Sequence, residues 1–393
     1  MEVQFVTSIN DIEPASWHSL SAHDYPFSRY EFLAALENSG AVDAKTGWQP
    51  LHAVLYGDHS SAHQQQDHKP LAVMPLYLKQ HSYGEYVFDW SWANAYQQHG
   101  YSYYPKLITA IPFTPAHGPR ILTADPNQLN WITNAFTAAI IEQADRLNAS
   151  SWHCLFPNDQ LLTALTQDDR LLVRKGCQFH WYNKGYQSFD DFLATFNSRK
   201  RKNLRKERQR VEQQGIELRR MNGAEISTEQ LNTFYEFYQS TYLKRGQTGY
   251  LNHLFFQLLC QTMPEQLVFV LAYHHNDLVA GALCFKDKET LYGRYWGCKE
   301  EYNALHFEAC YYQGIEYCIE HNLNRFDSGA QGEHKIQRGF TPITTWSTHW
   351  IAHPGFRTAI DDFVQREADH IDLYINDASD YLPFKADLAL KNP

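Results

Sequence analysis

Apolar residues recur along the second half of the chain with two spacings, alternation typical of strands and a three-to-four-residue repeat typical of helices. This order of strands and helices predicts a mixed α/β sheet. The predicted strands lie at 267–273, 278–285, 290–296 and 344–351, and the predicted helices at 189–214, 228–244, 251–262 and 304–321.

The first half of the chain is less regular. It has a helical repeat at 130–147, a strand-like run at 151–156 and an aromatic block at 88–104. In the second half, Ser188 and Asp191 fit a capping box, which sets the start of the 189–214 helix. A chain of 393 residues favours two domains. We expect an N-terminal domain at 1–175 and a C-terminal domain at 176–393.

The composition narrows the class of protein. Hydrophobic residues make up 44% of the chain, which argues against global disorder, and the net charge of −10 argues against binding nucleic acid over the whole surface. The apolar runs are too short to span a bilayer, and the first residues lack the pattern of a secretory signal. Seven cysteines without a CxxC pair indicate reduced thiols, and we expect a cytoplasmic protein.

The segment 325–340 is the densest candidate site in the sequence. Glycines that permit close backbone approach alternate here with charged side chains that are costly to bury unpaired. The alternative is a tight turn whose charges face water. The residues concerned are Gly329, Gly332, Glu333, His334, Lys335, Arg338 and Gly339.

A second candidate is the basic run within the predicted helix at 189–214. Like charges at helical spacing destabilise a helix, and a phosphate-rich ligand would offset that cost: a nucleotide, coenzyme A, tRNA or an anionic glycan precursor. The alternative is a solvated helix face neutralised by nearby acids. The cations are Arg199, Lys200, Arg201, Lys202, Arg205, Lys206, Arg208 and Arg210.

Two further segments carry candidate chemistry. The strand around Tyr292 and Arg294 leads into a helix that presents His306 and Glu308, and a helix N-terminus after a strand is an anion site. Neither His306 with Glu308 nor Glu333 with His334 has metal-ligand spacing, so we expect no metal. In the aromatic block, Trp90 and Trp92 predict either a sugar-stacking surface or a core.

Together these motifs resemble a bacterial family of FemAB-like proteins within the GNAT acyltransferase superfamily, labelled as peptidoglycan biosynthesis or recognition. The resemblance implies two tandem GNAT-like domains with mixed, mostly antiparallel sheets, the second carrying the main site. It covers nearly the whole chain. The motifs are GWQP (47–50), YYPKL (103–107), PFTP (112–115), the basic run, LYGRYWG (291–297), LHFEACYYQGIEY (305–317) and GAQGEHKIQRGF (329–340).

The resemblance implies an N-acyltransferase whose donor is acyl-CoA, such as acetyl-CoA, or aminoacyl-tRNA. The acceptor would be an amine of a cell-wall precursor or a small metabolite. In this interpretation Lys335 neutralises charge on the donor, and Glu333, His334 or Glu308 takes the amine proton. Arg294 to Gly297 occupies the place of a pyrophosphate-binding motif, but Lys299 stands where that motif has Gly or Ala, which leaves room for another donor.

The alternative function is a recognition module that binds a glycan or anionic ligand without turnover. Both functions need residues that bind a donor or a substrate. The expected donor-binding residues are Arg294, Tyr295, Trp296, Gly297, Gly329, Gln331, Gly332 and Arg338, and the expected substrate-binding residues are Arg199, Lys200, Arg201, Lys202, Arg205, Trp90, Trp92, Tyr292 and His306.

Overall fold

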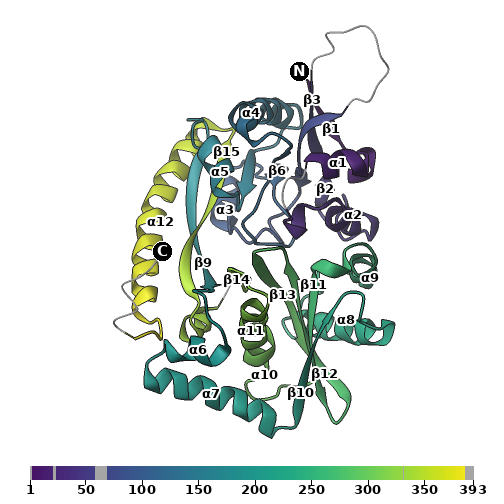
Figure 1. Ribbon diagram of the computed structural model, residues 1–393. Coiled ribbons are helices and arrows are strands. Elements are labelled where there is room, and N and C mark those ends of the chain that lie inside the picture. Colours follow the sequence, from purple (N-terminus) through teal and green to yellow (C-terminus); the bar gives the residue numbers. More distant parts are fainter. Residues whose placement is uncertain (1, 21–23, 58–68, 331, 386–393) are drawn as a thin grey trace. The chain divides into compact units, whose positions relative to one another are not determined.

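The computed structural model describes residues 2–20, 24–57, 69–330 and 332–385. The chain divides into two compact units (Figure 1), which are described separately. Unit 1 comprises Met1–Gly176 and Thr345–Asp372, and unit 2 comprises Cys177–Thr344 and Leu373–Pro393. The division into domains at 1–175 and 176–393 stays a prediction. The first compact unit ends close to that boundary, at Gly176, but it also includes the later segment Thr345–Asp372.

Unit 1 contains two sets of paired strands, ordered β1-β3-β4-β7 and β2-β5-β6-β8-β15. The pairs are antiparallel except β6 with β8. The strands are β1 (Glu2–Val6), β2 (Trp48–Pro50), β3 (His52–Tyr56), β4 (Pro70–Met74), β5 (Tyr77–Lys79), β6 (Lys106–Thr109), β7 (Leu122–Thr123), β8 (Ser151–Leu155) and the part of β15 (Thr341–Ile351) from Thr345 onward.

Helices pack apolar side chains against these strands. Phe136 and Ile140 of one helix share a core with Leu55 and Trp152. The helices are α1 (Pro14–Leu20), α2 (Tyr30–Asn38), α3 (Trp90–Gln98), α4 (Leu129–Arg146), α5 (Asp159–Leu165) and the part of α12 (Pro354–Asp380) up to Asp372.

Unit 2 has one sheet in the order β10-β11-β12-β13-β14-β9, antiparallel except for the pair β13 and β14. The strands are β9 (Leu172–Tyr182, in unit 2 from Cys177), β10 (Ile216–Asn222), β11 (Leu267–His274), β12 (Asp277–Lys286), β13 (Thr290–Cys298) and β14 (Arg325–Asp327). The helices are α6 (Phe189–Ala194), α7 (Ser198–Gln213), α8 (Thr228–Leu243), α9 (His253–Thr262), α10 (Leu305–Phe307), the π-helical turn η5 (Glu308–Tyr312), α11 (Gln313–Glu320) and the 3-10 helix η6 (Glu333–Arg338).

Helices cover both faces of this sheet (Figure 1). α8 lies so close to β13 that a Cβ on Gly297 would stand 2.1 Å from the carbonyl oxygen of Phe237, so only glycine fits there. On the other face, Ala309 of the π-helical turn packs against Ala282 of β12. Successive residues of a strand point to opposite faces, which is why Gly281 meets α8 while Ala282 meets the π-helical turn.

The strongly periodic elements are confirmed, and one predicted helix is corrected. Ser188 caps α6 as expected by accepting a hydrogen bond from the amide of Asp191. The predicted helix at 189–214, however, is two helices. The side chain of Asn197 accepts from the amide of Lys200 and so starts α7 afresh. The basic run therefore has its own helix.

Candidate active site

Strand β13 has an edge that its neighbour covers only in part. The parallel pairing with β14 ends, among the described residues, at Tyr292 and Asp327, whereas β13 continues to Cys298. On its other side the register between β12 and β13 shifts at Arg294, which marks a bulge. Trp296 accepts a 2.9 Å hydrogen bond at its carbonyl from Thr241 Oγ1. Cys298 likewise accepts at its carbonyl from Ser240 Oγ, at 3.4 Å, so only the other backbone groups of this edge are candidates for binding a ligand.

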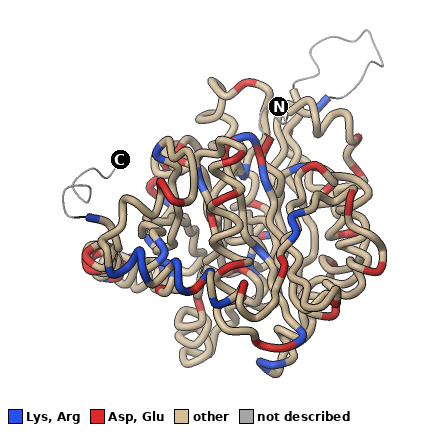
Figure 2. The backbone as a smooth tube through the Cα atoms, turned by 60° about the horizontal axis from the view of Figure 1, so that its bottom comes forward, with Lys and Arg blue, Asp and Glu red and all other residues tan. Residues whose placement is uncertain are grey.

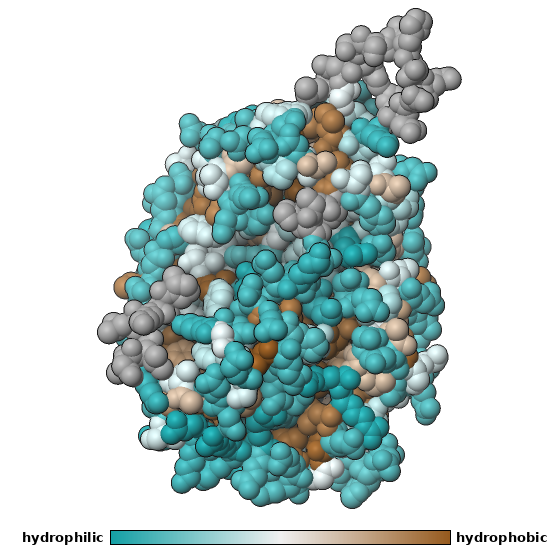
Figure 3. All heavy atoms as spheres, viewed as in Figure 1, coloured by the Kyte–Doolittle hydropathy of each residue, from teal (hydrophilic) through white to brown (hydrophobic). Residues whose placement is uncertain are grey.

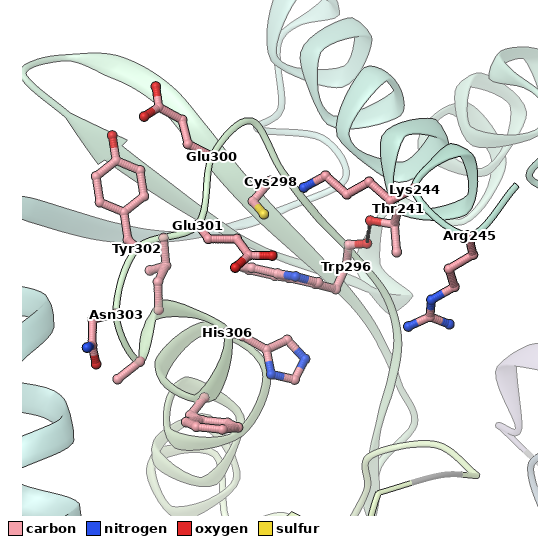
Figure 4. Close-up of a pocket in the computed structure, with 13 residues that line it drawn as sticks. Thr241, Lys244, Arg245, Trp296, Cys298, Glu300, Glu301, Tyr302, Asn303 and His306 are labelled. Atoms are coloured by element: carbon pink, nitrogen blue, oxygen red, sulfur yellow. Dashed lines mark hydrogen bonds between the residues drawn. The ribbon is translucent and has the colours of Figure 1, made fainter.

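Two pockets adjoin this edge, and Trp296 and His306 line both of them. The large pocket measures about 730 Å³ and lies between the end of α8, the end of β13 and residues 300–307 (Figure 4). Its charged lining residues are Lys244, Arg245, Glu300 and Glu301. The small pocket measures about 120 Å³ and is lined by residues 282–284, 293–296, His306, Cys310, Tyr311 and Ser328. The large one is in the size range of sites for cofactors and small ligands.

An imidazole stands where the two pockets meet. The ring of His306 lies edge-on to Trp296, with 5.4 Å between ring centroids. Burial, followed by the charges of His334, Arg338 and Lys335, lowers the pKa of His306 to about 4. Beside it, a ring nitrogen of His334 lies 2.8 Å from the hydroxyl of Tyr311. His306 is therefore neutral near pH 7, and its low pKa makes the ring a weak base.

A buried cation lies next to the small pocket. The ammonium of Lys335 donates a 2.6 Å hydrogen bond to the carbonyl of Gly329, and the residue is only 1% exposed. Burial lowers its pKa to about 8; Asp327 opposes this shift and Arg294 adds to it. The turn that delivers the acceptor carbonyl needs glycine, because Gly329 has φ +92°.

Arg294 lines the small pocket, but its side chain is held in an ion pair. Its guanidinium donates to both carboxylate oxygens of Asp327, at 2.8 and 3.3 Å, and its side chain is 3% exposed. Arg294 to Gly297 lie inside β13, not in the loop before the helix. The loop itself carries Glu300 and Glu301, whose charges repel a pyrophosphate. Burial would raise the pKa of Asp327, but Arg294 and His180 hold it well below its usual range.

Behind the pockets, α7 contributes an acid and a cation to a layer of ion pairs. Glu207 accepts from the guanidinium of Arg338, at 2.9 and 3.0 Å, and from the hydroxyl of Tyr312. Arg208 donates to both oxygens of Glu308, at 2.9 and 3.0 Å. Glu308 is 3% exposed and lines neither pocket, so the structure does not bring this expected base to them.

Other expected site residues also lie away from the two pockets. Tyr292 is 2% exposed and donates to Asp287, and Glu333 accepts from Tyr374. Trp90 and Trp92 belong to α3 of unit 1, where Trp92 is part of a core. Gln331 lies outside the described residues. Gly332, with φ +117°, precedes η6 without lining either pocket.

The basic helix turns its cations in two directions. Lys200 donates to Gln337 of η6, and Arg205 pairs with Asp190. Among the described residues no acid pairs with Arg199, Arg201 or Lys202, and the same holds for Lys206 and Arg210. Figure 2 shows the run of basic residues along this helix. The helix thus supports the site from behind and leaves a charged outer side.

Sequence reasoning missed several residues of the pockets. Tyr311, Cys310, Ser328, Lys244 and Glu301 line them. The signal available for Tyr311 was its place in a helix that already presented His306 toward a strand end. For Lys244 and Ser328 the sequence carried no comparable signal, because both reach the pockets from other elements.

The described residues contain neither a metal-binding cluster nor a helix able to span a membrane. They hold no group of three or more His, Cys, Asp or Glu side chains arranged to bind a metal. None of their helices combines the length and the apolar character needed to cross a bilayer.

Comparison with known proteins identifies the family. The FemAB-like family model, described as peptidoglycan biosynthesis/recognition, matches residues 8–386. The chain belongs to the FemAB-like family. A search of curated proteins gives no match. Family membership makes this FemAB-like chain an acyl- or aminoacyl-transferase of a cell-wall-related process.

Solved structures share the fold at low sequence identity. The crystal structure of FemX matches with a TM-score of 0.50 and 12% identity, covering 92% of this chain and 100% of FemX. The C-terminal domain of a putative lysylphosphatidylglycerol synthetase from Agrobacterium fabrum matches with a TM-score of 0.54 and 9% identity, covering 91% of this chain and 97% of that domain. The expected α/β fold with mixed and mostly antiparallel sheets is confirmed.

Proposed function

We propose that this FemAB-like protein transfers an acyl or aminoacyl group from an activated donor to an amine, using the two pockets beside β13. The observation that carries the proposal is that Trp296 and His306 line both pockets. A donor made of a large polar carrier and a small acyl group fits this pair of spaces, with the reactive carbonyl near His306.

In the proposed reaction, β13 binds the donor and Lys335 stabilises negative charge. The free edge of β13 holds the donor through backbone hydrogen bonds, and preorganised donors of this kind stabilise a developing oxyanion. The ammonium of Lys335 adds positive charge beside the small pocket, since Arg294 and Cys310, which line that pocket, are among the groups that shift its pKa. No covalent enzyme intermediate is required, because proximity supplies much of the acceleration.

The chemical step conserves atoms and charge. The amine nitrogen attacks the carbonyl carbon and forms a C–N bond. The amine proton passes to the neutral ring of His306, which replaces Glu308 in that role. The intermediate then collapses, the C–O bond of an ester or the C–S bond of a thioester breaks, and the proton moves to the leaving oxygen or sulfur.

The large pocket has two cations, Lys244 and Arg245, and two acids, Glu300 and Glu301, and we take the two acids as favouring an aminoacyl donor over acyl-CoA. Glu300 and Glu301 stand in the loop before α10, where a helix N-terminus would otherwise attract phosphate. Carboxylates at this place attract the ammonium of an aminoacyl ester instead. We assign the acceptor amine to a cell-wall precursor, in line with the description of the family.

A transfer assay tests the proposal. The donors are alanyl-tRNA and acetyl-CoA, and the acceptor is a cell-wall precursor peptide with a lysine amine. We expect transfer from alanyl-tRNA, with loss of transfer in Trp296→Ala and normal transfer in Trp131→Ala, a matched change on α4 of unit 1. If neither donor gives transfer or raises the melting temperature, which a bound ligand does by mass action, the proposal fails.

A further inference from the structure

The outer side of α7 carries a row of cations that the proposed reaction does not use. A helix turns by about 100° per residue, so Arg199, Lys202, Arg205, Lys206 and Arg210 fall within one outward arc. All five are exposed. The buried residues of this helix, Leu204 and Val211, point the opposite way. The arc contains no acid, and over Arg199–Arg210 it extends about 17 Å.

This row stands out against the charge of the whole chain. The net charge is −10, so a concentration of cations on one helix side is not a general property of the surface. Asp190 pairs with Arg205, and the other four cations of the row have no acidic partner among the described residues. Holding like charges together costs stability unless an anionic partner offsets it. The row therefore has the charge of a docking surface.

The residues around the row of cations indicate what kind of partner it binds. Hydrophilic residues cover the surface where α7 runs (Figure 3). Tyr381 is 66% exposed and lies beside the start of α7, since its carbonyl accepts from Gln337, which in turn bonds Lys200. Tyrosine next to cations is typical of side chains that sit at a membrane–water interface.

We propose that the outer side of α7 docks unit 2 on an anionic lipid surface. A flat surface can be touched by the exposed half of a helix. Leu204, Val211 and the Glu207 and Arg208 ion pairs hold the other half of α7 against the protein, so only the outer half of the helix can contact a partner. The major groove of an RNA helix is deep and narrow.

Vesicle sedimentation tests this proposal with two variants of equal charge. The docking variant replaces Arg199, Lys202, Lys206 and Arg210 by Gln, and the control replaces Lys45, Arg146, Lys288 and Lys299 by Gln. Each variant takes the net charge from −10 to −14. On vesicles of phosphatidylcholine with 30% phosphatidylglycerol, we expect binding to fall about 10³-fold in the docking variant only.

Three other results would overturn the proposal. The first is equal binding of the wild type to pure phosphatidylcholine vesicles. The second is an equal loss of binding in both variants, which would show an effect of net charge alone. The third is binding of tRNA, but not of vesicles, that depends on the four α7 cations, which would assign the row to RNA. The proposed transfer reaction stands or fails separately, because the assay of transfer uses no lipid.

Discussion

Each unit of the protein contains a cluster of buried titratable groups, and the two clusters differ in what surrounds them. In unit 1, Lys106 donates to Glu85 and Asp89, Tyr103 donates to Asp89 at 2.6 Å, and ring nitrogens of His153 and His349 lie 2.6 Å apart. No member of this cluster is more than 4% exposed. In unit 2, Lys335 is as deeply buried, but its neighbours His306 and Tyr311 line pockets.

The comparison shows that burial and a shifted pKa do not by themselves mark an active site. Burial lowers the pKa of His153 well below its usual range and raises that of Glu85 to about 7. These buried groups pair with one another through Lys106, while one oxygen each of Glu85 and Asp89 has no hydrogen-bond partner among the described residues. Structural ion pairs shift pKa values as active sites do. In unit 2 the shifted groups adjoin space that a ligand can fill, and there the same chemistry can act on a substrate.

The largest effect is expected for Lys106→Met in unit 1. It leaves the buried carboxylate of Asp89 without its cation and leaves Glu85 with only Lys79, at 4.0 Å. Removing one partner of a buried pair costs about 3–5 kcal/mol. Hydrogen exchange of the β6 amides would measure the loss of local stability. The matched change Lys335→Met should cost much less, because Asp327 keeps Arg294. An equal cost in both variants would contradict the contrast between the clusters.

The same Lys335→Met change should act on catalysis instead. Loss of one preorganised positive group beside the reacting carbonyl is expected to lower kcat about 10²-fold, at the low end of the range for an oxyanion donor. Steady-state transfer assays on the folded variant would show it. A variant that keeps full activity would remove Lys335 from the site.

The pH dependence of transfer activity should show a smaller effect than the Lys335→Met change, and it is specific to the charge of Lys335. The pKa of Lys335 is lowered from 10.5 to about 8, so activity that needs the cation should fall about tenfold per unit above pH 8. Between pH 8 and 10.5 the unfolded chain binds more protons at this group, so its contribution to stability rises with pH while activity falls. In Lys335→Arg the fall in activity above pH 8 should disappear, because arginine stays charged. If activity still fell above pH 8 in this variant, the titration of another group would cause the fall.

The periodic elements could be predicted from the sequence, whereas elements set by caps and distant contacts could not. β11, β12, β13 and α8 follow the apolar spacing closely. The break between α6 and α7 depends on the N-cap at Asn197. It was not predicted because the basic run that follows continues the helical pattern. Helix α3 was missed because its aromatic residues, such as Tyr96, pack on Phe356 of α12, far along the chain. The short strand β14 depends wholly on pairing with β13 and β9.

In the candidate site, too, local patterns could be predicted from the sequence and distant contacts could not. His306 and Trp296 were found because a strand leading into a helix is a recognisable site for chemistry. The ion pair of Arg294 could not be predicted, because its partner Asp327 is 33 residues away and only the fold brings the two charges together. The ion pair of Glu308 could not be predicted for a similar reason, since Arg208 lies 100 residues earlier. Long-range pairing decides whether a charged residue is structural or available.

The smallest expected effect compares one tyrosine from each cluster. Tyr103→Phe removes a donor to the buried Asp89 and should cost about 1–3 kcal/mol of stability in unit 1, because a buried carboxylate oxygen loses its partner. Tyr311→Phe removes only the bond to His334, whose side chain is exposed and can bond water, so stability should change by less than about 1 kcal/mol. Transfer should nevertheless slow about tenfold, because the hydroxyl orients the imidazole beside His306. If Tyr311→Phe proved the more destabilising of the two and left kcat unchanged, the unit 2 cluster would be a core network like that of unit 1.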